Sequence, residues 1–176
     1  YQYDWQETQI DPVGSYFSTT DLAGGGAEKV LLGFGSAPDT IPVGAPVSVP
    51  VGVAVPRGTT REGDESGQYG AAFRIFAPRL AGTEFGLYYL NYTSRLPIIS
   101  AVTGTLTGLG KGNYAASAHY FLEYPDDISL YGLSFNSQLG RSGIALQGEV
   151  SMRQDVPLQV DDVELLYAAL SPLRLL

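Results

Sequence analysis

The clearest pattern in the chain is an alternation of apolar with small or polar residues from 131 to 153. It covers 131–139 and then 144–153, and a Gly-Arg-Ser-Gly break separates the two runs. Period-two alternation is typical of an extended strand with one apolar and one polar face, and a short glycine-containing break is typical of a hairpin. Each run has the length of a membrane-spanning barrel strand, about 9–11 residues, whereas soluble strands peak near 5–6. We therefore predict a hairpin of two long strands.

The alternation assigns a face to every residue of this hairpin. We expect Ile144, Leu146, Val150 and Met152 to face lipid. The opposite face is uncharged except at its far end, as a wet barrel lumen would allow. The residues that we expect to face a lumen are Asn136, Gln138, Gln147, Glu149 and Arg153, together with Arg95 outside the hairpin. A solvated sheet face of a soluble protein has the same alternation, so the pattern alone leaves both interpretations open.

Weaker extended patterns occur elsewhere in the chain. The further strands that we predict cover 1–6, 29–34, 68–76, 84–92 and 113–122. Together with the hairpin they predict an all-β fold, an antiparallel meander that forms part of an outer-membrane β-barrel. On this interpretation residues 1–176 belong to one barrel domain.

A different spacing begins at Asp161. Apolar residues recur there three and four positions apart, at Val163, Leu166, Tyr167 and Leu170. Asp161 or Asp162 would cap the N-terminus of a helix, and Pro172 would end it. We predict a short helix near 162–170.

The segment 36–60 is rich in proline and valine. Prolines at 38, 42, 46, 50 and 56 remove backbone donors and exclude a helix or a central strand, while valine alternates from 47 to 55. We predict an extended loop that packs against or into a barrel mouth. A disordered linker is the alternative, although solvated linkers are seldom this rich in valine.

The aromatic residues are mostly tyrosine, with 12 Tyr against 7 Phe and 1 Trp. Tyrosine suits a membrane–water interface because its ring is apolar and its hydroxyl stays hydrated. The aromatic residues that we expect in interfacial belts are Tyr1, Tyr3, Trp5, Tyr88, Tyr89, Tyr92 and Tyr131.

Composition excludes several classes of protein. A net charge of −8 argues against a nucleic-acid-binding surface, which needs clustered Lys and Arg. The absence of cysteine excludes disulfides, zinc–thiolate sites and a cysteine nucleophile. No proline-free apolar run reaches about 18 residues, so the sequence predicts no transmembrane helix.

Motifs for catalysis are missing as well. The single histidine, His119, lies in an alternating segment, where a packing role is the commoner one. Residues 132–136 lack the second glycine of a serine-nucleophile elbow, and 108–112 lack the residues of a phosphate loop. The acidic pairs at 126–127 and 161–162 are typical of caps and turns. We expect no enzyme, no metal site and no cofactor.

Several stretches, taken in order, resemble one known family. They are Tyr1-Gln2-Tyr3-Asp4-Trp5, Gly14-Ser15-Tyr16-Phe17-Ser18-Thr19, Gly67-Gln68-Tyr69-Gly70, Glu84-Phe85-Gly86-Leu87-Tyr88-Tyr89-Leu90-Asn91-Tyr92, Ser94-Arg95-Leu96-Pro97, Tyr124-Pro125-Asp126-Asp127-Ile128, Tyr131-Gly132 and Gln147-Gly148-Glu149-Val150-Ser151. They are similar to the domain of unknown function 1302 family, large outer-membrane β-barrel proteins of Gram-negative bacteria. Thr93 departs from the pattern, which has a histidine there.

The resemblance implies a location in the bacterial outer membrane, with the lipid bilayer as a partner. It also implies an outer-membrane lipoprotein and an inner-membrane efflux-type permease as further partners. The chain would be an internal or N-terminal part of a longer member. We expect a porin-like protein for the passage of small, hydrophobic molecules. The alternatives are a soluble β-rich secreted or periplasmic ligand-binding module and an outer-membrane hydrolase, against which the missing nucleophile motif counts.

Overall fold

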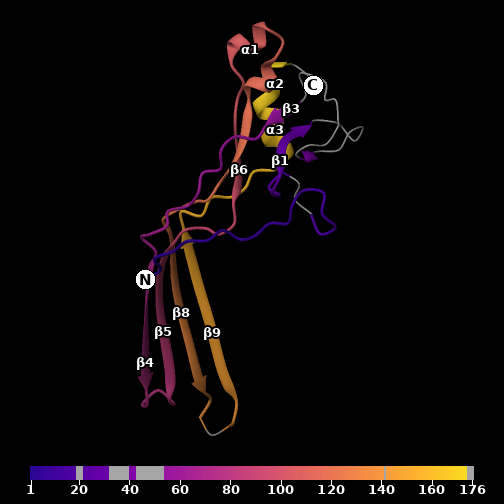
Figure 1. Ribbon diagram of the computed structural model, residues 1–176. Coiled ribbons are helices and arrows are strands. Elements are labelled where there is room, and N and C mark those ends of the chain that lie inside the picture. The colour runs from indigo at the N-terminus through magenta and orange to yellow at the C-terminus, as the bar shows by residue number, and fades with distance from the viewer. Residues whose placement is uncertain (19–21, 32–39, 43–53, 141, 174–176) are drawn as a thin grey trace. The chain divides into compact units, whose positions relative to one another are not determined.

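The computed structural model describes residues 1–176 except 19–21, 32–39, 43–53, 141 and 174–176 (Figure 1). The chain divides into two compact units. The first, here called the sheet unit, consists of Tyr1–Gln6, Gly63–Arg95 and Pro125–Pro157. The second, here called the mixed unit, consists of Glu7–Glu62, Leu96–Tyr124 and Leu158–Leu176.

The sheet unit is built on four long antiparallel strands. These are β4 (Tyr69–Ala77), β5 (Thr83–Tyr92), β8 (Ile128–Gln138) and β9 (Ala145–Gln154). They lie in the order β4-β5-β8-β9, and each pair keeps one register along its whole ladder (Figure 1). The hairpin predicted over 131–153 is confirmed as β8 and β9.

Two short turns join these strands at one end of the sheet. In the first, Gly82 has a positive φ of 71° and Ala81 one of 55°, and the Thr83 amide donates to the Leu80 carbonyl at 3.0 Å. In the second, Gly140 and Gly143 have positive φ, and the Leu139 amide donates to the Ile144 carbonyl at 2.8 Å. Glycine adopts these left-handed conformations without the steric cost that a Cβ brings. Ala81 bears that cost, because the tight turn between β4 and β5 requires it.

The mixed unit contains shorter strands. A three-stranded sheet has the order β2-β1-β3, formed by β1 (Ala27–Leu31), β2 (Thr40–Pro42) and β3 (Ala54–Pro56). A second pair consists of β6 (Ile98–Val102) and β7 (His119–Glu123). Two parallel bridges, Arg57 with Tyr120 and Arg61 with Glu123, place 57–61 beside β7.

Short helices complete the mixed unit. They are α1 (Leu106–Gly110), α2 (Tyr114–Ser117), α3 (Asp162–Leu170) and the 3₁₀ helix η1 (Ser171–Leu173). The Thr105 hydroxyl caps α1 by accepting from the Gly108 amide at 3.0 Å. The predicted helix near 162–170 is confirmed as α3.

The apolar core of the described residues lies in the mixed unit. Side chains from β1, β3, α2 and β7 meet there, with Ile99 and Ala101 of β6 packed against them. The buried members are Leu22, Val30, Val55, Tyr114, Ala115, Ala118 and Tyr120. This unit therefore has a buried apolar core of its own.

The prediction of one strand over 113–122 is wrong. Tyr114–Ser117 form α2, and β7 begins only at His119. Alanine favours helix and is depleted in strands, and one helical turn is enough to bury both Tyr114 and Ala115. The strand predicted at 1–6 is also wrong, because this segment pairs only through a bridge between Gln2 and Gln68.

The predicted all-β class is confirmed, because the described strands form antiparallel sheets and the helices are few and short. The described residues do not form a closed barrel. Residues 1–176 fall into two compact units, whereas we predict a single domain from the sequence. Most of the proline- and valine-rich segment 36–60 lies outside the described residues; its described parts include the strands β2 and β3.

Candidate functional site

The four-stranded sheet has two chemically different faces. Residues paired across antiparallel strands share a face, so the register assigns one to every side chain. One row, for example, contains Phe73, Leu87, Leu133 and Val150. The apolar face, as we call it, carries no charge within the strands. Its large side chains are Tyr69, Phe73, Ile75, Phe85, Leu87, Tyr89, Tyr131, Leu133, Phe135, Leu146, Val150 and Met152.

Most of these side chains are exposed rather than packed. Phe73 is 65% exposed, Val150 63% and Leu133 45%. Soluble monomers rarely expose a continuous apolar patch larger than a few hundred Å². Within the sheet unit, these side chains stay exposed on the surface of the sheet.

Three tyrosines mark one end of the apolar face. The ring of Tyr89 lies 6.0 Å from that of Tyr69 and 5.1 Å from that of Tyr131, so three neighbouring strands contribute to one cluster. At the other end, the hydroxyls of Thr83 and Ser137 lie 2.7 Å apart. Between these ends Phe135 lies over Gly148, where an added Cβ would collide with the ring.

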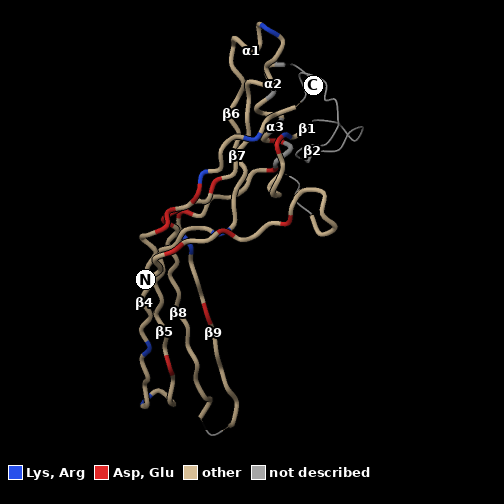
Figure 2. Tube along the Cα trace, in the orientation of Figure 1, with Lys and Arg blue, Asp and Glu red and all other residues tan. Residues whose placement is uncertain are grey.

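The opposite face, here called the polar face, holds every charged residue of the four strands. These are Arg74, Glu84, Glu149 and Arg153, and they are widely spaced along the strands (Figure 2). Tyr88 also lies on this face, above Gly86, where an added Cβ would collide with its hydroxyl. The Tyr88 and Ser134 hydroxyls are 3.2 Å apart.

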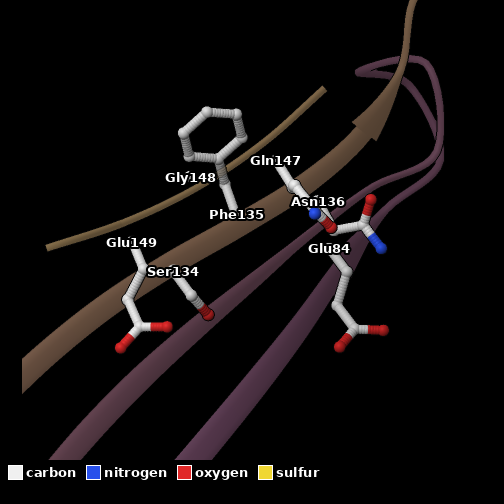
Figure 3. Close-up of a pocket in the computed structure, with 7 residues that line it drawn as sticks. All are labelled: Glu84, Ser134, Phe135, Asn136, Gln147, Gly148 and Glu149. Atoms are coloured by element: carbon white, nitrogen blue, oxygen red, sulfur yellow. The ribbon is translucent and has the colours of Figure 1, made fainter. Parts of the chain in front are cut away.

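A shallow hollow of about 390 Å³ lies on the polar face. Figure 3 shows the carboxylates of Glu84 and Glu149 on the same side of the sheet as Ser134, while the Phe135 ring points to the opposite side. Asn136 and Gln147 are paired across β8 and β9 and add two amides to the lining. The hollow therefore offers both donors and acceptors of hydrogen bonds, and two carboxylates.

The comparisons with known proteins bear on the whole chain. The family described as Protein of unknown function (DUF1302) matches residues 1–175. The chain belongs to this family. Neither the comparison with curated proteins nor that with solved structures gives a match.

In this DUF1302 member the predicted lumen-facing residues mostly share a face. Asn136, Gln138, Gln147, Glu149 and Arg153 all lie on the polar face. Arg95 follows the end of β5 and is exposed outside the strands, so the register does not bring it to that face. Whether the polar face lines a lumen stays a prediction.

Further polar-face residues lie in β4 and β5. Arg74 and Glu84 were missed because glycines, alanines and paired aromatics obscure the alternation there. Their position follows only from the register with β8. On the other face, Leu146, Val150 and Met152 lie together as predicted, and Ile144 precedes β9.

The aromatic-belt prediction is partly wrong for this DUF1302 member. Tyr89 and Tyr131 do form a cluster on the apolar face, joined by Tyr69. Tyr88 lies on the polar face, and Trp5 is buried, with its indole Nε1 donating to the Ser94 carbonyl at 3.1 Å.

Thr93, where the resemblance leads us to expect a histidine, takes part in a partly buried polar cluster of the sheet unit. Its hydroxyl donates to Asp126 Oδ1 at 2.9 Å, and the Asp64 amide donates to the same oxygen at 2.9 Å. One carboxylate thus ties together the segments that precede β4, follow β5 and precede β8. This role is structural, and sequence spacing gives no sign of it.

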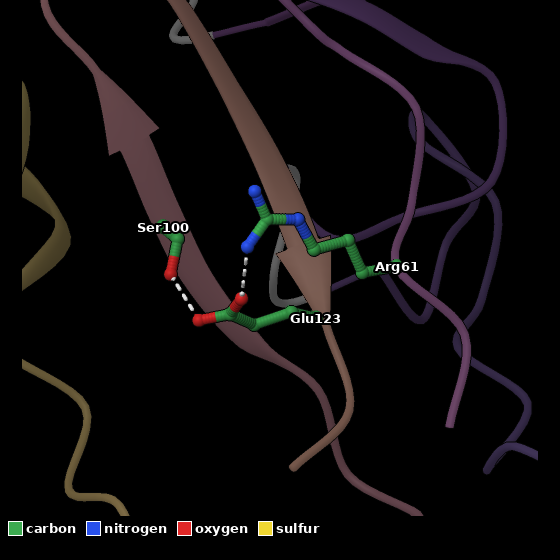
Figure 4. Close-up of polar contacts among 3 residues, drawn as sticks. All are labelled: Arg61, Ser100 and Glu123. Carbon is green, nitrogen blue, oxygen red and sulfur yellow. Dashed lines mark hydrogen bonds and ion pairs between the residues drawn. The ribbon is translucent and has the colours of Figure 1, made fainter. Parts of the chain in front are cut away.

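The mixed unit has its own polar cluster, drawn in Figure 4. Glu123 of β7 pairs with Arg61 at 3.3 Å and accepts from the Ser100 hydroxyl at 2.6 Å. The Arg61 guanidinium lies 4.4 Å from the centre of the Phe121 ring. These contacts hold 57–61 against β7.

Two tyrosines beside this cluster are protonated at neutral pH. Burial, together with the hydrogen bond that its hydroxyl donates to Glu7, raises the pKa of Tyr124. Burial also raises the pKa of Tyr120, whose hydroxyl has no partner among the described residues. In the described part of the chain no three acidic or histidine side chains gather to hold a metal, and no helix has the length and apolarity to cross a membrane.

Proposed function

We propose that the sheet unit forms part of the wall of an outer-membrane β-barrel through which small, hydrophobic molecules pass. The observation that carries this proposal is the separation of the two faces of the sheet. Every strand charge lies on one face, and the other presents large apolar side chains without a cover. Barrel walls require this arrangement, because one face contacts lipid and the other an aqueous interior.

The dimensions of the apolar face support a bilayer as its solvent. Strand β8, from Ile128 to Gln138, covers about 34 Å at about 3.4 Å per residue. A strand tilted by about 40° projects that length onto about 26 Å, close to the apolar band of about 25 Å in known barrels. The tyrosine cluster of Tyr69, Tyr89 and Tyr131 then lies at the level of one aromatic girdle.

A soluble ligand-binding module is less consistent with the same surface. Burying apolar area is worth about 25 cal/mol per Å², so a soluble fold would cover Phe73, Leu133 and Val150 with its own core. The chain instead places its described core in the mixed unit. If lipid contacts the apolar face, these side chains are removed from water without any protein packing over them.

Passage of molecules rests on the chemistry of the polar face. Between its four charges this face carries amides, hydroxyls and small residues, together with the apolar side chains Phe76, Leu90 and Leu130. Such a lining sets only a weak electrostatic barrier against uncharged solutes. The apolar character of the solute, and cooperation with an outer-membrane lipoprotein and an inner-membrane permease, follow from the resemblance described above and are part of the proposal.

Two tryptophan substitutions at neighbouring positions test the proposal. Gln147→Trp places a bulky ring on the polar face, and Leu146→Trp places the same ring on the apolar face. Gram-negative cells that make the whole protein should take up a small hydrophobic fluorescent probe faster than cells that lack it. We expect Gln147→Trp to slow this uptake several-fold and Leu146→Trp to leave it unchanged. Equal uptake with and without the protein would contradict the proposal.

A further inference from the structure

The two ends of the four-stranded sheet differ in the length of their connections. At one end, here called the turn end, the short turns 78–82 and 139–144 join neighbouring strands. At the other, here called the connection end, β5 ends and β8 begins, and the chain between them covers 93–127. β4 also begins at the connection end, and β9 ends there.

The chain therefore always passes from the sheet unit to the mixed unit at the connection end. The chain passes into the mixed unit after Gln6 and after Arg95, and again after Pro157. At the turn end each strand continues directly into its neighbour. The asymmetry is a property of the topology and does not depend on side chains.

Specific side-chain contacts hold the connection end together. Asp126 binds the Thr93 hydroxyl and the Asp64 amide there, and Trp5 binds the Ser94 carbonyl. The tyrosine cluster on the apolar face lies toward this end of the strands. The exits of the long connections are thus fixed by specific contacts.

We propose that the connection end of the sheet faces the outside of the cell and that the turn end faces the periplasm. This inference rests on the proposed function, because it assumes that the sheet crosses the outer membrane. In outer-membrane barrels the periplasmic connections are short turns and the extracellular connections are longer. The segments that lead to the mixed unit then leave the membrane on the outer side, and a solute approaching from outside meets that end of the sheet first.

Single cysteines at the two ends of β4 test this orientation. The chain has no cysteine, so each introduced thiol is the only one in residues 1–176. Ser66 lies just before β4 and Arg79 just after it; both are exposed. Cells that make the whole protein, as Ser66→Cys or Arg79→Cys, would be treated with a membrane-impermeant maleimide, before and after the outer membrane is permeabilised. Labelling of denatured protein provides the reference for full reaction.

We expect Ser66→Cys to react in intact cells and Arg79→Cys to react only after permeabilisation. The reverse pattern would overturn the orientation and leave the membrane-spanning sheet in place. Reaction of both thiols only after permeabilisation, or of both in intact cells, would contradict the orientation and the proposed function together. The failures of the two proposals are therefore distinguishable.

Discussion

The sheet unit and the mixed unit place their apolar residues in opposite ways. In the mixed unit Val55 and Tyr120 are fully buried, and Arg61 and Glu123 form an ion pair at the surface. In the sheet unit Phe73 and Val150 are more than half exposed, and the charges lie on the other face of the same strands. The mixed unit thus follows the rule for folding in water, and the exposed apolar face of the sheet unit is the feature on which our proposal of a bilayer-facing surface rests. The difference teaches that an exposed apolar side chain destabilises a fold only where the solvent that it contacts is water.

The largest effect that we predict is in the mixed-unit core. Tyr120→Ala leaves a cavity at a fully buried position and should cost about 3–5 kcal/mol. Tyr120→Phe removes only a hydroxyl without a partner among the described residues, so it should change stability by less than about 1 kcal/mol. Hydrogen exchange followed by mass spectrometry should show faster exchange in β7 of Tyr120→Ala, while β8 stays protected. Equal loss of protection in both strands would show that the two units unfold as one.

The next effect is on the apolar face of the sheet. Leu133→Arg places a charge near the middle of this face and should cost about 2–4 kcal/mol when the protein folds into phospholipid vesicles. Ser134→Arg, one residue further along β8, faces the polar side and should cost much less. Urea titration of the vesicle-bound protein measures both. If the two variants were equally stable, the two faces would have the same solvent.

The smallest effect concerns the ion pair of the mixed unit. The side chain of Arg61 is 69% exposed and that of Glu123 28%, so solvent screens the attraction between them. Glu123→Gln should cost less than about 1 kcal/mol, and the difference should shrink as salt is added. Urea unfolding at low and high salt measures this loss. A cost of several kcal/mol that does not depend on salt would mean that the pair behaves as a buried one.

The sequence predicts the sheet unit far better than the mixed unit. In β8 and β9 each residue's face follows from strict alternation, so the positions of Asn136, Gln147 and Glu149 were predictable. The short strands and helices of the mixed unit carry too few residues to show a period, and β6 and α1 were missed for that reason.

Contacts between distant segments were not predictable. The burial of Trp5 depends on the carbonyl of Ser94, and the role of Thr93 depends on Asp126. No local pattern marks such partners, because they meet only when the sheet has formed. Tyr88 and Tyr89 show the same limit: both look like interfacial aromatics, and only the register separates them onto different faces.

The most direct test of a membrane-spanning sheet compares two neighbouring residues of β9. Nitroxide labels would be attached to Leu146→Cys and Gln147→Cys in the whole protein, folded into phospholipid vesicles. Collisions with oxygen report lipid exposure, and collisions with a water-soluble nickel chelate report water exposure. We predict that the label at 146 responds mainly to oxygen and the label at 147 mainly to the chelate. The same response at both positions would contradict the assignment of lipid and water to opposite faces of this sheet.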